Sequence, residues 1–261
     1  MTLPTVPESF YWSSSPVGPV LKCRPLEKVA EHLFTTREAQ LSSADQWRQI
    51  GSLIGVTEVV TLNQVHGRKV VTCRRGWPPV PGRQDADALV SDDPGIAVAV
   101  RAADCVPLLL ADARTGAVAA VHAGWRGTAA GVVPAAAQAL EREFGARPKD
   151  LVAAIGPSIG ACCYDVGTEH VDAFAAAGHA RHLIDRWFLA PPARRGSRER
   201  PELRLDVAAA NRDQLILAGL REENLHDCGL CTAMHLDVLT SYRAEKEKAG
   251  RLAAVIRGRP T

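Results

Sequence analysis

Residues 95–123 read GIAVAVRAADCVPLLLADARTGAVAAVHA, three apolar runs separated by two polar turns. The runs Gly95–Arg101, Val106–Ala111 and Ala117–His122 have the length of strands and are rich in Val, Leu and Ala. Their nearly continuous apolar character predicts strands that are covered on both faces. This stretch therefore predicts a layered protein with a buried sheet.

Sequence patterns on both sides of this stretch predict more strands and several helices. The additional strands are Glu58–Leu62, Lys69–Cys73, Ala86–Val90, Leu151–Ile155 and Leu252–Ile256. The predicted helices are Gly127–Phe144, Thr168–Ala177 and Asp206–Leu220, with Thr128 and Asp206 as N-caps. A run of strands followed by interspersed helices is typical of a layered α+β domain rather than of a regular βαβ alternation.

The bulk composition excludes several classes of protein. With 261 residues, of which 46% are hydrophobic and 23% charged, the chain can bury a core without disulfides or structural metals. A net charge of +2 gives no reason to expect a nucleic-acid partner, and no apolar run is long enough to span a membrane. We expect a cytoplasmic protein without a signal peptide. Residues 1–261 are expected to form a single catalytic domain, as a monomer or weak homo-oligomer, with a solvated loop at Pro191–Pro201.

The cysteines do not suggest a disulfide framework, because there are seven of them in a chain expected to be cytoplasmic. The pair Cys228-x-x-Cys231 is a candidate for a second metal site or a redox pair. A single such motif is weak support, and consecutive cysteines such as Cys162 and Cys163 seldom share one tetrahedral metal. We therefore interpret these four as packing thiols.

Three short segments place metal-binding side chains beside predicted strand ends. They contain His66 in NQVHG (63–67), Cys105 in ADCVP (103–107) and His122 in VHAGWRG (121–127). Two imidazoles and a thiolate suit Zn²⁺, and three protein ligands leave a fourth position for water or substrate. Spacing alone favours hydrogen-bonded core histidines and an inert thiol, because the three residues are far apart in sequence.

The segment after His122 is typical of an anion-binding turn. Gly124–Thr128 joins a predicted strand to a predicted helix, whose N-terminal N–H groups attract anions. Arg126 adds a planar donor for phosphate or carboxylate, and Gly127 lets a ligand approach the backbone. An ordinary turn, with an arginine that pairs with a structural carboxylate, explains the same residues equally well.

Taken together, these segments resemble the YfiH-type laccase-domain family, also called the purine nucleoside phosphorylase or multicopper-oxidase-like laccase family. The resemblance covers about residues 63–256, and residues 1–62 are less specific. It is carried by the phrases NQVHG, DADALV, RAADCVPLLLAD, AVHAGWRGT, IGPSIGACCYDVG, LDVAAANRDQL, CTAMHLDVLTSYR and GRLAAVI. It implies an α+β sandwich of mixed sheets flanked by helices, with a metal site at His66, Cys105 and His122.

The activity implied by this resemblance is similar to that of purine nucleoside phosphorylases. Members act on adenosine, inosine and methylthioadenosine, and they have adenosine deaminase activity as well. The chain then looks like a zinc enzyme whose partners are a purine nucleoside and phosphate, with Cys105, His66 and His122 as its catalytic groups. In that case the zinc ion activates water or organises phosphate for attack.

Substrate contacts are expected beside this metal site. Asn63 and Gln64 can hydrogen-bond a ribose or a base, although capping of their own turn is the ordinary alternative. Phosphate is expected near the helix that Gly127 opens, with Arg126 or Arg101 as donors.

Two other activities also follow from the resemblance. One bacterial relative is associated with removing a wrongly added serine from a UDP-muramyl precursor of peptidoglycan, which predicts a zinc or cysteine hydrolase with Cys105 as ligand or nucleophile. Some members were first described as copper polyphenol oxidases (laccases), and Cu²⁺ outcompetes Zn²⁺ at many such sites. Electron-transfer copper sites usually add an axial methionine, and the chain has only two methionines, Met1 and Met234. This scarcity argues against oxidase chemistry.

The chain departs from the family pattern in two places. Tyr164-Asp165-Val166 stands where Tyr-Glu-Val is usual. Beyond Arg243, the residues Ala244–Glu247 replace the usual pair of arginines followed by an acid. The second change weakens any role carried over to the C-terminal basic residues, although Arg243 itself is present.

Overall fold

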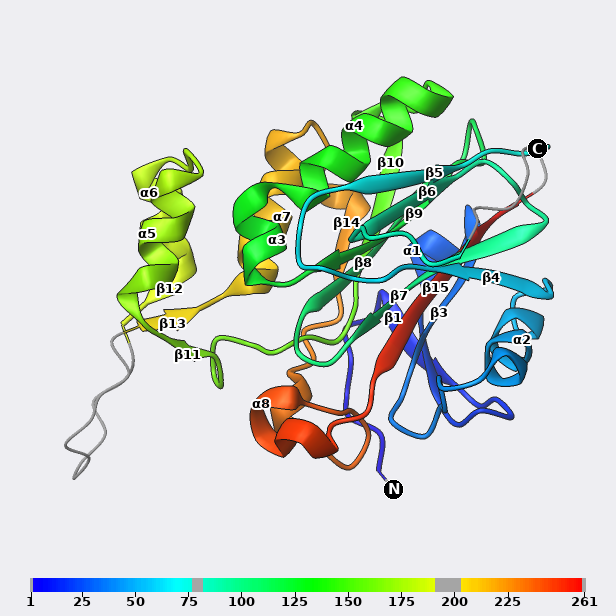
Figure 1. Ribbon diagram of the computed structural model, residues 1–261, viewed down its shortest axis with the longest axis horizontal. Helices are drawn as coiled ribbons and strands as arrows, with labels where there is room; N and C mark the ends of the chain where they lie inside the picture. The colour runs from blue at the N-terminus through cyan, green and yellow to red at the C-terminus, as the bar shows by residue number, and fades with distance from the viewer. Residues whose placement is uncertain (1, 77–81, 191–202, 260–261) are drawn as a thin grey trace.

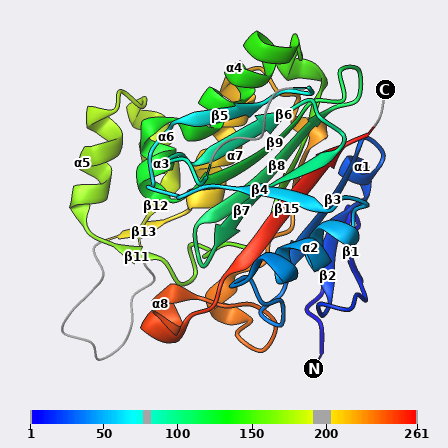
Figure 2. The ribbon, with the colours of Figure 1, turned by 45° about the vertical axis from the view of Figure 1, so that its right-hand side comes forward.

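The structure, a computed structural model, describes residues 2–76, 82–190 and 203–259, and its strands form three sheets (Figures 1 and 2). In spatial order, the first sheet contains β1 (Phe10–Ser13), β2 (Val20–Cys23), β3 (Ala30–Thr35), β15 (Leu252–Gly258), β7 (Ile96–Ala102) and β4 (Glu58–Thr61). The second contains β14 (Leu225–Asp227), β10 (Leu151–Ile155), β8 (Val106–Asp112), β9 (Val118–Ala123), β6 (Ala88–Ser91) and β5 (Val70–Cys73). The small third sheet contains β11 (Asp165–Val166), β13 (Leu203–Leu205) and β12 (Phe188–Leu189).

Both large sheets are mixed. β4 pairs with β7 in parallel while β15 pairs with β7 antiparallel in the first sheet, and β5 and β6 are parallel while β8 and β9 are antiparallel in the second. The helices are α1 (Arg24–Glu27), α2 (Ala44–Ser52), α3 (Trp125–Ala130), α4 (Val132–Phe144), α5 (Thr168–Ala176), α6 (Arg181–Trp187), α7 (Val207–Leu217) and α8 (Tyr242–Glu245). Short 3₁₀ helices lie at Pro148–Asp150, Glu222–Asn224, Thr232–Met234 and Lys246–Lys248. The predicted α+β fold of mixed sheets flanked by helices is confirmed.

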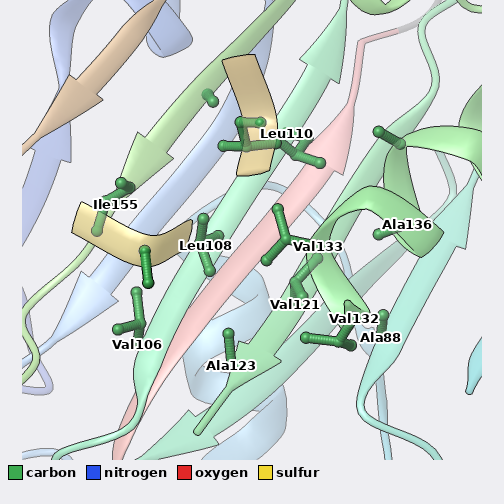
Figure 3. Packing of buried hydrophobic residues seen from close by; sticks show 14 of the residues in the cluster. Ala88, Val106, Leu108, Leu110, Val121, Ala123, Val132, Val133, Ala136 and Ile155 are labelled. Atoms are coloured by element: carbon green, nitrogen blue, oxygen red, sulfur yellow. The ribbon is translucent and has the colours of Figure 1, made fainter. Parts of the chain in front are cut away.

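The two large sheets pack face to face, because both present apolar side chains to a shared core. Successive side chains of a strand point to opposite faces. Leu109 of β8 therefore joins Val98 of β7 in the core between the sheets, whereas Leu108 and Leu110 belong to the core on the other face of β8. Figure 3 shows Val133 of α4 beside these two leucines. This arrangement explains why residues 95–123 are apolar at almost every position.

A helix covers the outer face of the first sheet as well. Ala97 and Ala99 of β7 pack with Trp47 and Ile50 of α2. A capping box at the start of α2 links the Ser43 side chain to the Gln46 backbone N–H and the Gln46 side chain to the Ser43 backbone N–H. The order of layers is therefore helix, sheet, sheet, helix, with α4 and α7 on one side and α2 on the other (Figures 1 and 2).

The predicted helix Gly127–Phe144 is wrong as a single element. The chain forms α3 and α4, which are separated by Gly131 at a left-handed φ of 78°. The predicted N-cap Thr128 is also wrong, because the N-cap of α3 is Gly124 and Thr128 lies buried inside the helix. The predicted N-cap Asp206 is confirmed, since its side chain accepts a hydrogen bond from the Ala209 N–H at 2.9 Å.

Several elements were not expected from the sequence. Strands β1 to β3 and helix α2 occupy much of residues 1–62, and β3 lies directly beside β15 in the first sheet. Helix α6 was not expected either, and it lies beside α5, which confirms the predicted helix Thr168–Ala177, at one end of the molecule next to the small sheet (Figures 1 and 2). The predicted surface loop Pro191–Pro201 lies outside the described residues. Within those residues, none of the helices is long and apolar enough to cross a membrane.

Candidate functional site

His66, Cys105 and His122 are brought together by the pairing of β4 with β7 and of β8 with β9. β4 and β7 are parallel, so the loop that follows β4 and carries His66 lies at the same edge as the turn that follows β7 and carries Cys105. β8 begins directly after Cys105 and pairs antiparallel with β9, where His122 lies opposite Pro107. Strand pairing therefore brings the two loops and the end of β9 to the same edge of the molecule.

The three side chains fit a single metal ion. Their candidate ligand atoms all lie within 4.8 Å of one another, and the Cys105 Sγ is 3.8 Å from the His66 Nε2. The two imidazole ring centroids are 4.9 Å apart and the ring planes cross at 78°. In a tetrahedral zinc site, Zn–S and Zn–N bonds of about 2.3 and 2.1 Å separate sulfur from nitrogen by roughly 3.6 Å. The donor set and its spacing therefore suit a tetrahedral ion.

Asp87, directly before β6, holds two of these segments in place. Its buried carboxylate accepts hydrogen bonds from the His122 Nδ1 at 2.9 Å and from the backbone N–H groups of His66 and Gly67 at 2.9 and 2.6 Å. Because Nδ1 of His122 is engaged in this way, Nε2 is the nitrogen that remains for a ligand role. Asp87 belongs to the DADALV phrase, but sequence reasoning gave it no function. The feature of the sequence that could have identified Asp87 is its position as a carboxylate immediately before an apolar strand.

Strained backbone occurs at the two loops that form the site. His66 and Asp104 are non-glycine residues with φ of 60° and 85°. The Asp104 carboxylate accepts hydrogen bonds at 2.6 Å from both the Thr232 hydroxyl and the Arg243 backbone N–H. These bonds fix the turn that presents Cys105, which offsets the conformational cost.

Hydrogen bonds shift the pKa values of Cys105 and His122 in opposite directions, toward a thiolate and an imidazolium. Burial raises the pKa of the Cys105 thiol, but hydrogen bonds from His122 and His66 outweigh burial and lower that pKa to about 6. Burial lowers the pKa of His122, but hydrogen bonds to Asp87 and Cys105 raise it to about 9. Burial also opposes ionisation of Asp87, yet the hydrogen bond from His122 holds its pKa below the usual value. The site thus stabilises a thiolate, the form that binds metals and acts as a nucleophile.

Alkylation of the metal-free protein with iodoacetamide should reveal this thiolate. Because the thiolate fraction of Cys105 rises as the pH passes its lowered pKa, half-maximal reactivity is expected near pH 6, measured by mass spectrometry of its peptide. The exposed Cys162 is an internal control that should react more slowly at pH 7, since burial of its sulfur and the neighbouring Cys231 raise its pKa to about 12. A midpoint for Cys105 near the ordinary thiol value of 9 would contradict the assignment.

The three candidate ligands lie in the wall of a cavity of about 760 Å³. Its other lining residues are Asn63, Gln64, Arg101, Ala102, Ala103, Asp104, Gly124, Trp125, Ile159, Tyr164, Val207, Tyr242, Arg243, Lys246, Glu247 and Arg251. This volume lies in the range of roughly 300–1,000 Å³ that is usual for small-molecule sites. The site therefore combines a donor set for a metal with room for a ligand.

Three of the five predicted substrate contacts line this cavity, namely Asn63, Gln64 and Arg101. The amide of Gln64 bonds to the backbone of Arg101 twice, donating to its carbonyl oxygen at 2.7 Å and accepting from its N–H at 2.8 Å. Asn63 donates from Nδ2 to the Asp85 carboxylate at 2.5 Å. Both amides thus tie the loop that carries His66 to distant segments of the chain, and neither caps its own turn through these bonds.

The other two predicted contacts, Arg126 and Gly127, are not among the lining residues. Arg126 is exposed and its guanidinium lies 4.4 Å from the centre of the Trp125 ring. Gly127 is buried inside α3, where an added Cβ would lie 3.1 Å from the Gly67 carbonyl oxygen. The predicted anion-binding turn is therefore part of the helix, which begins at Trp125.

A cationic wall, of which the sequence predicted only Arg101, faces the cavity. Arg101, Arg243, Lys246 and Arg251 all line it, and none of them forms an ion pair with a carboxylate within the described residues. The guanidinium of Arg243 lies 5.0 Å from the centre of the Tyr164 ring and donates to the Asp165 carbonyl oxygen. Lys246 belongs to the stretch that departs from the family pattern. These cations make the cavity suited to an anionic ligand.

Gly124 keeps space open between the candidate ligands. A Cβ at this position would lie 2.8 Å from the Cys105 Sγ and 3.0 Å from the His66 Cδ2. Gly124→Ala should therefore lower metal affinity by about 10- to 100-fold in a competition titration. Because φ at Gly124 is −70°, the fold and the melting temperature should change little.

The matched control for this substitution is Gly250→Ala, since an added Cβ there would contact only Thr240 at 3.8 Å. It should bind metal as the unsubstituted protein does. Equal metal affinity in both variants would show that the space at Gly124 is not needed for the site.

Comparison with known proteins identifies relatives that match between about two thirds and nearly all of the chain. It is 36% identical over 170 residues to a purine nucleoside phosphorylase of Bacteroides thetaiotaomicron, covering 65% of this chain but only 60% of that protein. It is 33% identical over 263 residues to a purine nucleoside phosphorylase of Deinococcus radiodurans, covering 93% of this chain and 94% of the relative. It is also 37% identical over 168 residues to adenosine deaminase RL5 from an unknown prokaryotic organism, covering 64% of this chain and 60% of the relative.

Solved structures share the fold. The hypothetical protein YfiH of Bacillus licheniformis superposes with a TM-score of 0.81 at 24% identity, over 95% of this chain and 99% of that one. YlmD from Geobacillus stearothermophilus superposes with a TM-score of 0.78 at 26% identity, over 97% and 100% of the two chains. The family described as multi-copper polyphenol oxidoreductase laccase matches residues 32–259, which include all three candidate ligands. The chain therefore belongs to the multi-copper polyphenol oxidoreductase laccase family.

Proposed function

We propose that this protein is a zinc-dependent enzyme that acts on purine nucleosides, by phosphorolysis of adenosine, inosine and methylthioadenosine and by deamination of adenosine. The observation that carries the proposal is the convergence of His66, Cys105 and His122 within 4.8 Å in the wall of a cavity with a cationic face. Relatives that are named purine nucleoside phosphorylase and adenosine deaminase support the substrate class.

The metal would be held by His66, Cys105 and His122. Zinc bound by three protein ligands lowers the pKa of water and polarises oxygen atoms. Asp87 orients His122 by accepting its Nδ1 proton, and Asp104 holds the turn of Cys105 through Thr232. These contacts fix the ligand geometry before a substrate arrives.

Two aromatic side chains are suited to hold a purine base. Trp125 and Tyr164 line the cavity, and ring stacking is the usual way in which a protein binds a planar base. Burial, together with the charge of Cys105, raises the pKa of Tyr164 to about 12, so its hydroxyl remains a hydrogen-bond donor at neutral pH. Asn63 and Gln64 remain candidates for ribose or base contacts at the cavity rim.

Phosphate is proposed to bind at the cationic wall. Arg101, Arg243 and Arg251 carry planar guanidinium groups that match phosphate oxygens, and burial lowers the pKa of Arg101. Of the donors predicted from sequence, Arg101 is the better placed. Arg126 and Gly127 would need to act from outside the cavity lining.

The test is incubation of the purified protein with adenosine, with and without inorganic phosphate, followed by chromatography of the products. Phosphorolysis should yield adenine only when phosphate is present, whereas deamination should yield inosine in both conditions. Absence of adenine, inosine and hypoxanthine above the level of a Cys105→Ala control would exclude the proposal.

The charged pair of Cys105 and His122 supports a second candidate, a hydrolase that edits a mis-aminoacylated UDP-muramyl precursor. A thiolate beside an imidazolium is the arrangement of a cysteine nucleophile. In that case mass spectrometry should show release of serine from the precursor without any need for phosphate. A product that forms only with phosphate would favour phosphorolysis instead.

A further inference from the structure

A second group of sulfur atoms lies outside the cavity. The Sγ atoms of Cys162, Cys163 and Cys231 lie within 4.8 Å of one another, although the third is far from the first two in sequence. None of the three residues lines the cavity of the candidate metal centre. The group is therefore separate from His66, Cys105 and His122, and the proposed function leaves it without a role.

The two chain segments that carry these thiols are held in register by backbone hydrogen bonds. The Ser158 N–H donates to the Leu230 carbonyl oxygen at 3.2 Å, and the Thr232 N–H donates to the Ser158 carbonyl oxygen at 3.0 Å. Cys231 lies opposite Ser158 in an isolated parallel bridge. Cys231 is consequently fixed before any ligand binds.

A turn explains how two consecutive cysteines can face one point. Consecutive side chains of a strand point in opposite directions. Here the chain turns at residues 161–163, and the N–H groups of Cys163 and Tyr164 both donate to the Gly160 carbonyl oxygen, at 2.9 and 3.1 Å. The expectation that Cys162 and Cys163 only pack does not take this turn into account.

Gly160 provides space and a hydrogen bond to the sulfur atoms. Its N–H donates to the Cys231 Sγ at 3.3 Å. An added Cβ at Gly160 would lie 3.4 Å from the Cys162 Sγ and 3.7 Å from the Cys231 Sγ. The missing side chain thus lets the backbone approach the sulfur group closely, and the Gly160 N–H holds the Cys231 sulfur in place.

From this geometry we propose that Cys162, Cys163 and Cys231 form a second metal site that binds one thiophilic d¹⁰ cation, Cu(I). Thiolate ligands select Cu(I), whereas zinc and harder ions favour sets that include nitrogen or oxygen or a fourth sulfur. Within the described residues, no histidine or carboxylate joins the three sulfurs as a fourth member. Cys162 is exposed, so an ion can reach the group from solvent.

Binding needs no change of oxidation state. Each thiol that coordinates gives up its proton to solvent, and a sulfur–copper bond replaces each sulfur–hydrogen bond. The motif Cys228-x-x-Cys231 does not act as a unit here, since Cys228 lies in the core between the sheets and is not a member of the group.

The experiment titrates full-length protein with Cu(I) under argon against a chromophoric Cu(I) chelator. A Cys105→Ala background removes copper binding at the first site. We expect one equivalent of Cu(I) to be retained, with only sulfur in its first coordination shell by X-ray absorption. Cys162→Ser and Cys163→Ser should each lower the affinity by about tenfold or more. Zinc in place of Cu(I) should bind more weakly.

Cys228→Ala is the matched control, because it removes the other cysteine of the motif and leaves the three sulfurs in place. It should retain Cu(I) as the background does, and Cys162→Ser, at an exposed turn, should keep the melting temperature of the background. The proposal is overturned if the background retains no Cu(I), if the first shell contains nitrogen, or if Cys228→Ala loses as much affinity as Cys162→Ser. A disulfide between Cys231 and either neighbour that survives reducing conditions would overturn it too.

Discussion

Cys105→Ala is expected to remove the metal from the proposed catalytic centre and to lower kcat/KM for adenosine by about 10³-fold or more. Only two imidazoles remain after this change, and the anionic ligand is the one that offsets the charge of the ion. A catalytic metal contributes several kcal/mol to transition-state stabilisation, and about 1.4 kcal/mol corresponds to a factor of ten in rate. Metal content by mass spectrometry and initial rates should fall together.

The control for this prediction is Cys73→Ala, which also replaces a buried thiol but lies in neither sulfur-containing metal group. It should keep the metal and most of the activity. His66→Ala adds a second comparison, because it removes a ligand and leaves the thiol. If His66→Ala keeps full activity while Cys105→Ala has none, Cys105 acts as a nucleophile and the metal-based proposal is wrong.

Asp87→Asn is expected to have the second-largest effect, on stability as well as on metal binding. The carboxylate is buried and accepts hydrogen bonds from His122, from the His66 N–H and from the Gly67 N–H. An asparagine of the same size directs N–H groups at some of these donors and leaves His122 without its anion. Breaking a buried charged pair costs about 3–5 kcal/mol, and loss of the group that orients a ligand costs about 10- to 100-fold in metal affinity.

The pH dependence of the metal-free protein provides an independent measurement. The pKa of His122 is raised, so its contribution to stability is fully present below its ordinary value of 6.5 and is lost as the pH rises through about 9. The pKa of Asp87 is lowered, so its contribution is present above its ordinary value of 3.8 and is lost as the pH falls through the lowered pKa. In Asp87→Asn the stability that is lost as the pH rises from 6.5 to about 9 should be smaller, because the pKa of His122 falls back below 9.

Asp85→Asn is the matched control, since this carboxylate lies two residues away, is exposed and accepts a hydrogen bond from the Asn63 amide. It should change the free energy of unfolding by no more than about 0.5 kcal/mol. Chemical denaturation and NMR titration of His122 measure both variants. An unchanged pKa of His122 in Asp87→Asn would contradict the role that we give to this carboxylate.

The central strands could be predicted from sequence because their signal is local. The runs at residues 95–123 are apolar at nearly every position, and only strands buried on both faces need such a composition. Strands β1 to β3 were missed because they are short and contain polar residues, such as Lys22 in β2 and Glu31 in β3, so that no long apolar run marks them. The break at Gly131 was missed because the apolar spacing of α4 continues across it. The left-handed backbone conformation of Gly131 depends instead on how α3 and α4 pack.

The chemistry of the candidate site could be predicted only in part. His66, Cys105 and His122 were identified through family resemblance, because their spacing carries no pattern of its own. Four other residues of the site were not identified in this way, because what they do depends on which segments surround them. They are Asp87, Tyr164, Lys246 and Arg251. The three-thiol group was missed for the same reason, since Cys231 meets Cys162 and Cys163 rather than its sequence neighbour Cys228.

By itself the sequence determined which segments are strands buried on both faces and which side chains are able to bind a metal, since both properties belong to residues and their immediate neighbours. The tertiary structure decided which of those side chains meet. His66 and Cys105 are 39 residues apart, and they converge because β4 and β7 are parallel neighbours that end at one edge. Pairing and register between distant strands arise from the packing of the whole core, so only the folded chain brings the two histidines, the thiolate and the carboxylate of Asp87 to one point.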